Sequence, residues 1–407
     1  MGKIFLCILV CLFTLMVTSY ANEEPDDTKL QTKHTVKKTK CLSRHCIAAS
    51  NRIFEYIDDK VDPCEDFNEF ACGGFNKNTI IPDDKSRWDI FSILTKEIEY
   101  HGRRLMEEPV DDKTDFESYK KAKTFYKACM DEEKQNELGL EPFREILAKA
   151  GGWPVVEGDK WDGKDFNIWD QSIKLHELGY SSDFFAEAFI YSDAKNNTHR
   201  VLYFDQASLG LSKEYWDKGL DEPEVKAYFQ YMVDVAVLLG AEETQAKVEL
   251  EKVRDFEMRL ANISAAKSER RNKTKLYNPT TLGEFPSDAG FPESWTDFVQ
   301  KIFNFGDDKL DIEDSERVII YDPNFYKNLS SVLQSTDNRT LANYAAWRMA
   351  SSTMKYLTSE ARDIRQKYSK ALTGSYILKY FCIYYQIKLI FYPEMKLEEV
   401  EKDQLLR

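Results

Sequence analysis

Apolar side chains recur every three or four positions along much of the chain, and this spacing predicts a mainly α-helical fold. The clearest stripe predicts one continuous helix of about eight turns with a buried face. Two stretches, 200–204 and 317–321, are rich in β-branched and aromatic residues and predict strands. The helical stripe consists of Tyr344, Trp347, Ala350, Met354, Leu357, Ala361, Ile364 and Tyr368.

The N-terminal region follows a different pattern. A basic residue precedes a 14-residue apolar run over 4–17, and small residues follow near position 21. This order is typical of a cleaved signal peptide over 1–21, because a membrane-spanning helix needs ~20 apolar residues. An uncleaved membrane anchor is the alternative. Residues 22–40 are polar and charged, which predicts a flexible leader.

The composition narrows the class of protein. The chain has 407 residues, of which 43 % are hydrophobic and 13 % aromatic, enough to build a large core. The formal net charge of −14 argues against a nucleic-acid partner, because such a surface repels phosphates. For a secreted protein, this charge indicates solubility.

Two further features predict export. Six cysteines follow the signal peptide, and an even number in an oxidising compartment indicates disulfide bonds rather than metal ligands. Five Asn-x-Ser/Thr segments predict N-glycosylation of a secreted, extracellular protein. Their asparagines are Asn196, Asn262, Asn272, Asn328 and Asn338.

The sequence offers no recognisable catalytic centre. It contains no His-Glu-x-x-His segment, the helical motif that holds zinc between two imidazoles and sets a carboxylate beside the bound water. The nearest match is His176-Glu177-Leu178-Gly179-Tyr180, with a tyrosine at the second ligand position. The five histidines are scattered without ligand spacing. We therefore predict no catalytic residues, no metal ligands and no cofactor in this chain.

Ten ordered segments together resemble the N-terminal half of neprilysin-type zinc metallopeptidases. The resemblance covers roughly residues 41–374. The segments are 41–46 (CLSRHC), 61–67 (VDPCEDF), 70–75 (FACGGF), 127–130 (KACM), 151–154 (GGWP), 205–206 (DQ), 209–211 (LGL), 260–263 (LANI), 321–323 (YDP) and 341–344 (LANY).

This resemblance implies the helical lobe of a two-lobed ectodomain around a peptide-sized chamber, with a few short strands. In the complete family enzyme, the other half supplies the zinc. One substrate contact is implied here: Ser86-Arg87-Trp88 resembles the segment whose arginine faces the carboxylate of the peptide's C-terminus. A guanidinium suits this contact because it binds a carboxylate at two points. Arg87 is equally compatible with a surface ion pair.

The resemblance also implies how the cysteines pair. It pairs Cys41 with Cys46 and Cys129 with Cys382. The family partners of Cys64 and Cys72 lie in the half with the zinc site, so these two residues are expected to be unpaired or to bond to each other or to another molecule.

The resemblance weakens near the C-terminus. An apolar and aromatic run follows residue 374, but Lys379, Gln386 and Lys388 interrupt it, which argues against a membrane span. We therefore predict four parts: a signal peptide (1–21), a flexible leader (22–40), a neprilysin-like N-terminal domain (41–374) and a divergent tail (375–407).

Three functions fit these features. The first is a secreted, non-catalytic protein that binds peptides, a neprilysin-like relative or a second copy of itself, as expected for a pseudoenzyme. The second is one part of a zinc metalloendopeptidase that cleaves peptides when complete. The third is a structural or toxin-like glycoprotein.

Overall fold

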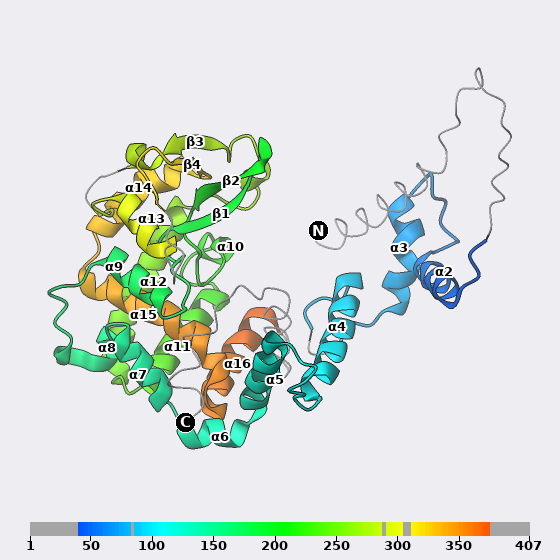
Figure 1. Ribbon diagram of the computed structural model, residues 1–407, viewed down its shortest axis with the longest axis horizontal. Helices are drawn as coiled ribbons and strands as arrows, with labels where there is room; N and C mark the ends of the chain where they lie inside the picture. The colour runs from blue at the N-terminus through cyan, green and yellow to red at the C-terminus, as the bar shows by residue number, and fades with distance from the viewer. Residues whose placement is uncertain (1–39, 83–84, 287–289, 304–310, 375–407) are drawn as a thin grey trace. The chain divides into compact units, whose positions relative to one another are not determined.

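The structure is a computed structural model that describes residues 40–82, 85–286, 290–303 and 311–374. The chain divides into two compact units, Met1–His101 and Gly102–Arg407 (Figure 1). The described parts are mainly helical with four short strands, which confirms the predicted fold class. The predicted signal peptide, nearly all of the leader and the tail lie outside the described residues. None of the described helices is long and apolar enough to cross a bilayer.

The first unit consists of helices whose starts are encoded locally. The helices are α2 (Arg44–Tyr56), α3 (Phe67–Asn78) and the first part of α4 (Ile90–Glu107). The Ser43 side chain accepts a hydrogen bond from the Cys46 amide, and that of Asp66 accepts one from the Glu69 amide at 2.9 Å. Such N-terminal caps satisfy amides that have no partner within the helix.

The first unit lacks a hydrophobic core of its own among its described residues. No residue of α2 is buried, and the side chains of Ile53 and Phe54 are 52 % and 73 % exposed. On α4, Phe91, Leu94 and Ile98 are also exposed. Their spacing of three and four positions places them along one side of the helix. Within the first unit itself, the apolar residues of α2 and α4 are therefore not packed into a core.

The second unit contains most of the described chain. Its helices after α4 are α5 (Glu117–Met130), α6 (Glu132–Leu138), α7 (Glu141–Lys149), α8 (Pro154–Glu157), α9 (Ile168–Glu177), α10 (Lys213–Trp216), α11 (Pro223–Leu238), α12 (Glu243–Ile263), α13 (Trp295–Phe303), α14 (Pro323–Gln334), α15 (Asn338–Thr353) and α16 (Ser359–Thr373). Four short 3₁₀ helices accompany them: η1 (Gly158–Lys160), η2 (Glu269–Arg271), η3 (Leu282–Glu284) and η4 (Met354–Tyr356).

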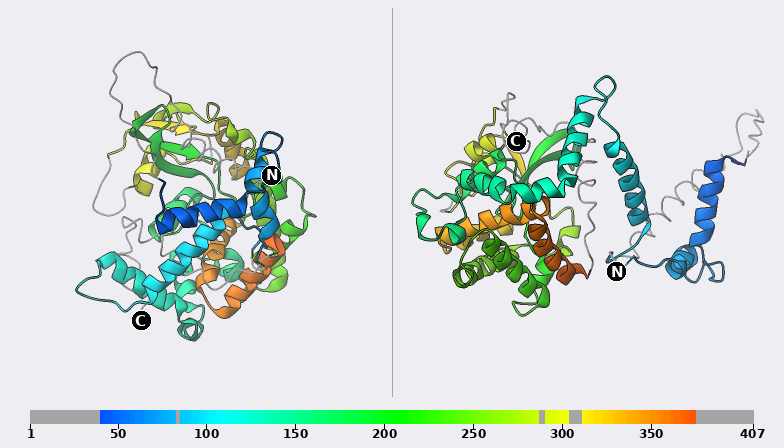
Figure 2. Two further views of the ribbon diagram at one scale, coloured as in Figure 1. Left: turned by 90° about the vertical axis from the view of Figure 1, so that its right-hand side faces the viewer. Right: turned by 90° about the horizontal axis from the view of Figure 1, so that it is seen from below.

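A four-stranded sheet lies at one end of this unit, away from α16 (Figures 1 and 2). The strands are β1 (Glu187–Asp193), β2 (Asn196–Asp205), β3 (Asn278–Thr281) and β4 (Arg317–Ile320), in the order β1-β2-β4-β3. The two strands expected from the sequence are β2 and β4, which pair in parallel with Tyr203 opposite Ile319. β1 and β3 pair antiparallel on either side.

The helix predicted from Tyr344 to Tyr368 is two helices, so that part of the prediction is wrong. α15 ends at Thr353, η4 follows, and α16 begins at Ser359. The Thr358 hydroxyl caps α16 because it accepts a hydrogen bond from the Ala361 amide at 3.3 Å. This cap favours a new helix start there. The apolar stripe still faces the core, because Trp347 of α15, Met354 of η4 and Ala361 of α16 are fully buried.

Candidate functional site

The segment closest to a zinc motif does not have the geometry of one. α9 ends at Glu177, and Gly179 adopts a positive φ of 80°, so Tyr180 is not one helical turn beyond His176. His176 is half-buried, and burial lowers its pKa while a hydrogen bond to the backbone of Ile302 opposes that shift. His176 is therefore a packed structural residue. Among the described residues, no three His, Cys, Asp or Glu side chains gather into a possible metal site.

Arg87 lies in the loop before α4, and its side chain is 82 % exposed. Its guanidinium lies 3.9 Å from the Asp89 carboxylate. That carboxylate also accepts a hydrogen bond from the Ser92 amide at 2.7 Å. Such an exposed pair contributes little to stability. The Arg87 guanidinium could therefore bind an anion without losing a strong internal partner.

The most constrained polar arrangement surrounds the loop 151–154. Gly151 and Gly152 have φ values of 102° and 79°, which favour glycine over residues with a Cβ atom. The amide of Val155 donates to Oδ1 of Asn343 at 2.9 Å. Asn343 belongs to another of the recognised segments, so the fold brings together two motifs that are far apart in the sequence.

A partly buried ion pair supports the same loop. Arg339 binds Glu249 through two hydrogen bonds of 2.9 Å and donates to the carbonyls of Pro154 and Gly158. Asn343 also donates to Glu249 at 2.8 Å. Burial disfavours ionisation of Glu249, but these bonds hold its pKa below the ordinary value. Glu249 and Arg339 thus fix α8 and the loop on α12 and α15.

Neither Glu249 nor Arg339 was predicted from the sequence. The signal available was a carboxylate on the apolar face of α12, where Ala246, Leu250 and Val253 are buried. A charged residue at such a position needs a partner, because an unpaired buried charge is costly. The sequence does not indicate that the partner is Arg339, 90 positions away.

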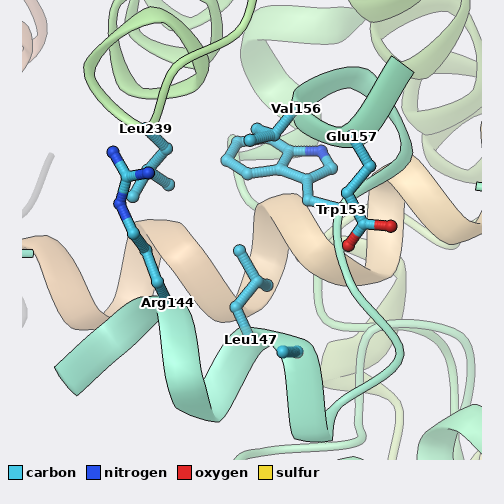
Figure 3. Close-up of a pocket in the computed structure, with 7 residues that line it drawn as sticks. Arg144, Leu147, Trp153, Val156, Glu157 and Leu239 are labelled. Atoms are coloured by element: carbon cyan, nitrogen blue, oxygen red, sulfur yellow. The ribbon is translucent and has the colours of Figure 1, made fainter. Parts of the chain in front are cut away.

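A cavity of about 170 Å³ lies beside this loop (Figure 3). Its lining is mostly apolar, with the Trp153 indole between the charged side chains of Arg144 and Glu157. The Trp153 indole N–H is buried and has no acceptor among the described residues. The remaining lining residues are Leu147, Ala148, Val156 and Leu239. Such a lining can hold an apolar side chain with an adjacent polar group.

A second buried carboxylate organises the recognised segment 209–211. Glu257 Oε1 accepts the amides of Gly210 and Leu211 at 2.7 and 3.0 Å, and Oε2 accepts the Tyr228 hydroxyl at 2.8 Å. The indole of Trp347 donates to the same hydroxyl at 2.8 Å. Burial raises the pKa of Glu257. Because every contact of this network is internal, its role is structural.

The described cysteines differ in oxidation state. Cys41 and Cys46 form a disulfide, as the resemblance implied. Cys129 is disulfide-bonded, but Cys382 lies outside the described residues. Cys64 is a free, exposed thiol, whereas Cys72 is disulfide-bonded. Cys64 and Cys72 are therefore not bonded to each other, and Cys72 is not a free thiol. Cys64 sits in an exposed turn before α3, whereas Cys72 lies on the buried side of that helix.

Two solved structures share the architecture of this chain. The M. tuberculosis zinc metalloprotease ZMP1 in complex with an inhibitor superposes with a TM-score of 0.64 at 18 % identity, over 84 % of this chain and 51 % of that one. PepO from Lactobacillus rhamnosis superposes with a TM-score of 0.60 at 17 % identity, over 80 % of this chain and 50 % of that one. At these identities the likeness shows the fold alone.

The N-terminal sequence profile of peptidase family M13 matches residues 63–384, so the chain belongs to peptidase family M13. Neprilysin-2 of Drosophila melanogaster is 34 % identical over 87 % of this chain and 45 % of its own length. Endothelin-converting enzyme 1 of Bos taurus is 32 % identical over 82 % of this chain and 43 % of its own length. The resemblance to neprilysin-type peptidases is confirmed, and the chain spans about half the length of these relatives.

Proposed function

We propose that this chain by itself is a secreted, non-catalytic protein that binds peptides or a protein partner through the N-terminal region of a neprilysin-type peptidase. The observation that carries the proposal is an apolar pocket on a firmly held loop, in a chain with no His-Glu-x-x-His segment. Among the described residues, no three His, Cys, Asp or Glu side chains gather where they could hold a metal ion that would activate a water molecule.

The pocket has the chemistry to bind one apolar side chain of a peptide. Leu147, Val156 and Leu239 supply apolar contacts beside the Trp153 indole. The charged side chains of Arg144 and Glu157 lie at the two sides of the pocket, where they would select among peptides by charge.

The test is peptide binding by the full chain secreted from eukaryotic cells. Fluorescence anisotropy of peptides with apolar side chains should show saturable binding, and internally quenched peptides should remain uncut with added zinc. Ala148→Phe should block the pocket, because Ala148 is an exposed lining residue. Lys149→Phe, also exposed but outside the lining, is the matched control. Zinc-dependent cleavage by the chain alone would overturn the proposal.

A second candidate function is favoured by the first unit. The apolar faces of α2 and α4 are exposed, and apolar patches of this kind mark interaction surfaces. We propose as the alternative that these faces bind the zinc-carrying region of a neprilysin-type peptidase, and that the two together cleave peptides. The matched relatives are about twice as long as the aligned region, which leaves room for such a region.

This alternative is tested by co-expressing the chain with the part of Drosophila melanogaster Neprilysin-2 that it does not match. A complex that cleaves quenched peptides, and stops when a chelator removes zinc, would support it. Phe91→Asp together with Ile98→Asp should abolish that complex, whereas Glu97→Gln on the same helix should preserve it. Failure of the two parts to associate at micromolar concentration would contradict the alternative.

A further inference from the structure

The four-stranded sheet has two edge strands, β1 and β3, and they differ in how well they are protected (Figure 1). β3 has four residues and contains Pro279, which lacks an amide hydrogen. Short length and proline are features by which natural proteins prevent a further strand from pairing with an edge. β1 has seven residues and contains neither proline nor a basic residue. The edge at β1 is therefore the one that can accept another strand.

The outer side of β1 is open over residues 187–191. β2 pairs with one side of β1. Among the described residues, no other strand pairs with the second side, and no backbone hydrogen bond from another segment reaches residues 187–191. Beyond Tyr191, the hairpin satisfies its own groups, because the Tyr203 hydroxyl donates to the Ser192 carbonyl at 3.1 Å and accepts the Ala194 amide at 3.2 Å. Unpaired strand backbone of this kind is a template for an added strand.

Two large side chains of this open part are exposed. Ile190 is 40 % exposed and Tyr191 is 64 % exposed. Because they are neighbours in a strand, they point to opposite faces of the sheet. An added strand would pack one of its side chains against each of them, on both faces at once. Such side-chain contacts give specificity to a strand that is held by backbone hydrogen bonds.

The start of β1 is acidic. Burial raises the pKa of Glu187, and the neighbouring carboxylates of Asp205 and Asp183 raise it further. The Arg270 guanidinium opposes this shift, but two of its nitrogens donate to Asp205. A basic side chain on an added strand would therefore meet a carboxylate that forms no ion pair among the described residues.

We propose that the edge of β1 binds an extended, basic segment of another polypeptide as an added antiparallel strand. Antiparallel pairing is the more stable arrangement, and it places the C-terminal end of the segment beside Glu187. A second copy of β1 fits less well, because the register that pairs all seven residues sets Glu187 opposite Asp193 of the copy. Like charges directly opposite each other destabilise a sheet.

The test is fluorescence anisotropy of a labelled octapeptide of alternating threonine and valine that ends in two lysines, with the full chain secreted from eukaryotic cells. Binding should be saturable, and hydrogen exchange of the 187–191 amides should slow in the complex. Two further copies of the peptide carry N-methyl groups on odd or on even amides. Because only alternate amides of a strand face its neighbour, one copy should lose affinity by at least about tenfold and the other should still bind.

Variants of the chain test the side chains. Ile190→Lys together with Tyr191→Lys should abolish binding, because it places two cations beside a basic strand. Val237→Lys together with Val248→Lys, at exposed apolar positions of α11 and α12, is the matched control. Glu187→Gln should weaken binding of the lysine peptide by about two- to fivefold, and it should leave binding of a peptide that ends in two glutamines unchanged.

Absence of binding, or equal affinity of the two methylated copies, would overturn the proposal. Self-association of the chain that is lost in Ile190→Lys with Tyr191→Lys would assign the edge to a second copy and overturn it as well. None of the residues that line the pocket at Trp153 belongs to β1, so Ala148→Phe should leave binding of the octapeptide unchanged. A failure of this inference is therefore distinguishable from a failure of the proposed function.

Discussion

The amide of Val155 donates a hydrogen bond to Oδ1 of Asn343 across 188 positions of sequence, at 2.9 Å in a buried environment. This bond joins the start of α8 to α15. Nδ2 of the same Asn343 side chain donates a second hydrogen bond to Glu249 of α12. One side chain therefore connects three parts of the second unit. Its removal leaves the Val155 amide without this acceptor and takes one of several hydrogen bonds from Glu249.

Asn343→Ala should lower the free energy of unfolding by about 2–4 kcal/mol, because a buried amide and a carboxylate each lose a hydrogen bond. Urea unfolding followed by tryptophan fluorescence measures the change. Asn324→Ala is the matched control, since Asn324 is exposed on α14. Equal midpoints for the two variants would show that the connection contributes nothing.

Arg339→Met should destabilise the second unit by about 1–3 kcal/mol, because Glu249 loses its cation but keeps the hydrogen bonds from Asn343 and Gln245. The same substitution should raise the pKa of Glu249, since the Arg339 hydrogen bonds hold that pKa below its ordinary value. The stabilisation that wild type gains from this lowered pKa is present above pH 4.5 and is lost as the pH falls below 4.5, so the difference in stability between wild type and the variant should shrink there. Thermal unfolding at several pH values tests this. A constant difference across that range would contradict the prediction.

Asp193 should make the stability of the sheet depend on acidic pH. The Lys195 amide and the Arg317 guanidinium, which lies 2.7 Å away, lower the pKa of Asp193 to about 2. Because the folded pKa is below the ordinary value of 3.8, the contribution is fully present above that pH and is lost as the pH falls toward about 2. Arg317→Met should reduce this acid-dependent loss.

The measurement for this prediction is the free energy of unfolding of both proteins between pH 5 and about pH 2, the range that spans the two pKa values. Arg271→Met is the control, because Arg271 is exposed and close in sequence to the same sheet. If Arg317→Met and Arg271→Met give the same pH dependence, Arg317 does not set the pKa of Asp193.

Cys64 should react with iodoacetamide in the native, unreduced protein, because its thiol is free and exposed. The disulfide-bonded residues Cys41, Cys46, Cys72 and Cys129 should react only after reduction. Peptide mapping by mass spectrometry distinguishes the two groups. Alkylation of Cys72 without a reductant, or protection of Cys64, would contradict the assignment. Cys64→Ser should leave the unfolding midpoint unchanged.

Several features could be predicted from the sequence because their cause is local. The helical stripe of Trp347, Met354 and Ala361 is buried as its spacing indicates, and the stretches around Tyr203 and Ile319 are strands. The apolar spacing did not predict that the helical stripe is divided between α15 and α16. Thr358 provides a local signal for a new helix start, but the apolar spacing continues unbroken past it.

The sequence by itself determined the family, the mainly helical class and the absence of a His-Glu-x-x-His segment, because these depend on the order and spacing of residues. Only the tertiary structure decided which distant residues meet. The ion pair of Glu249 and Arg339 and the different states of Cys64 and Cys72 follow from how helices pack and which faces they bury. Burial makes a partner necessary, but the identity of that partner depends on distances that the sequence does not specify.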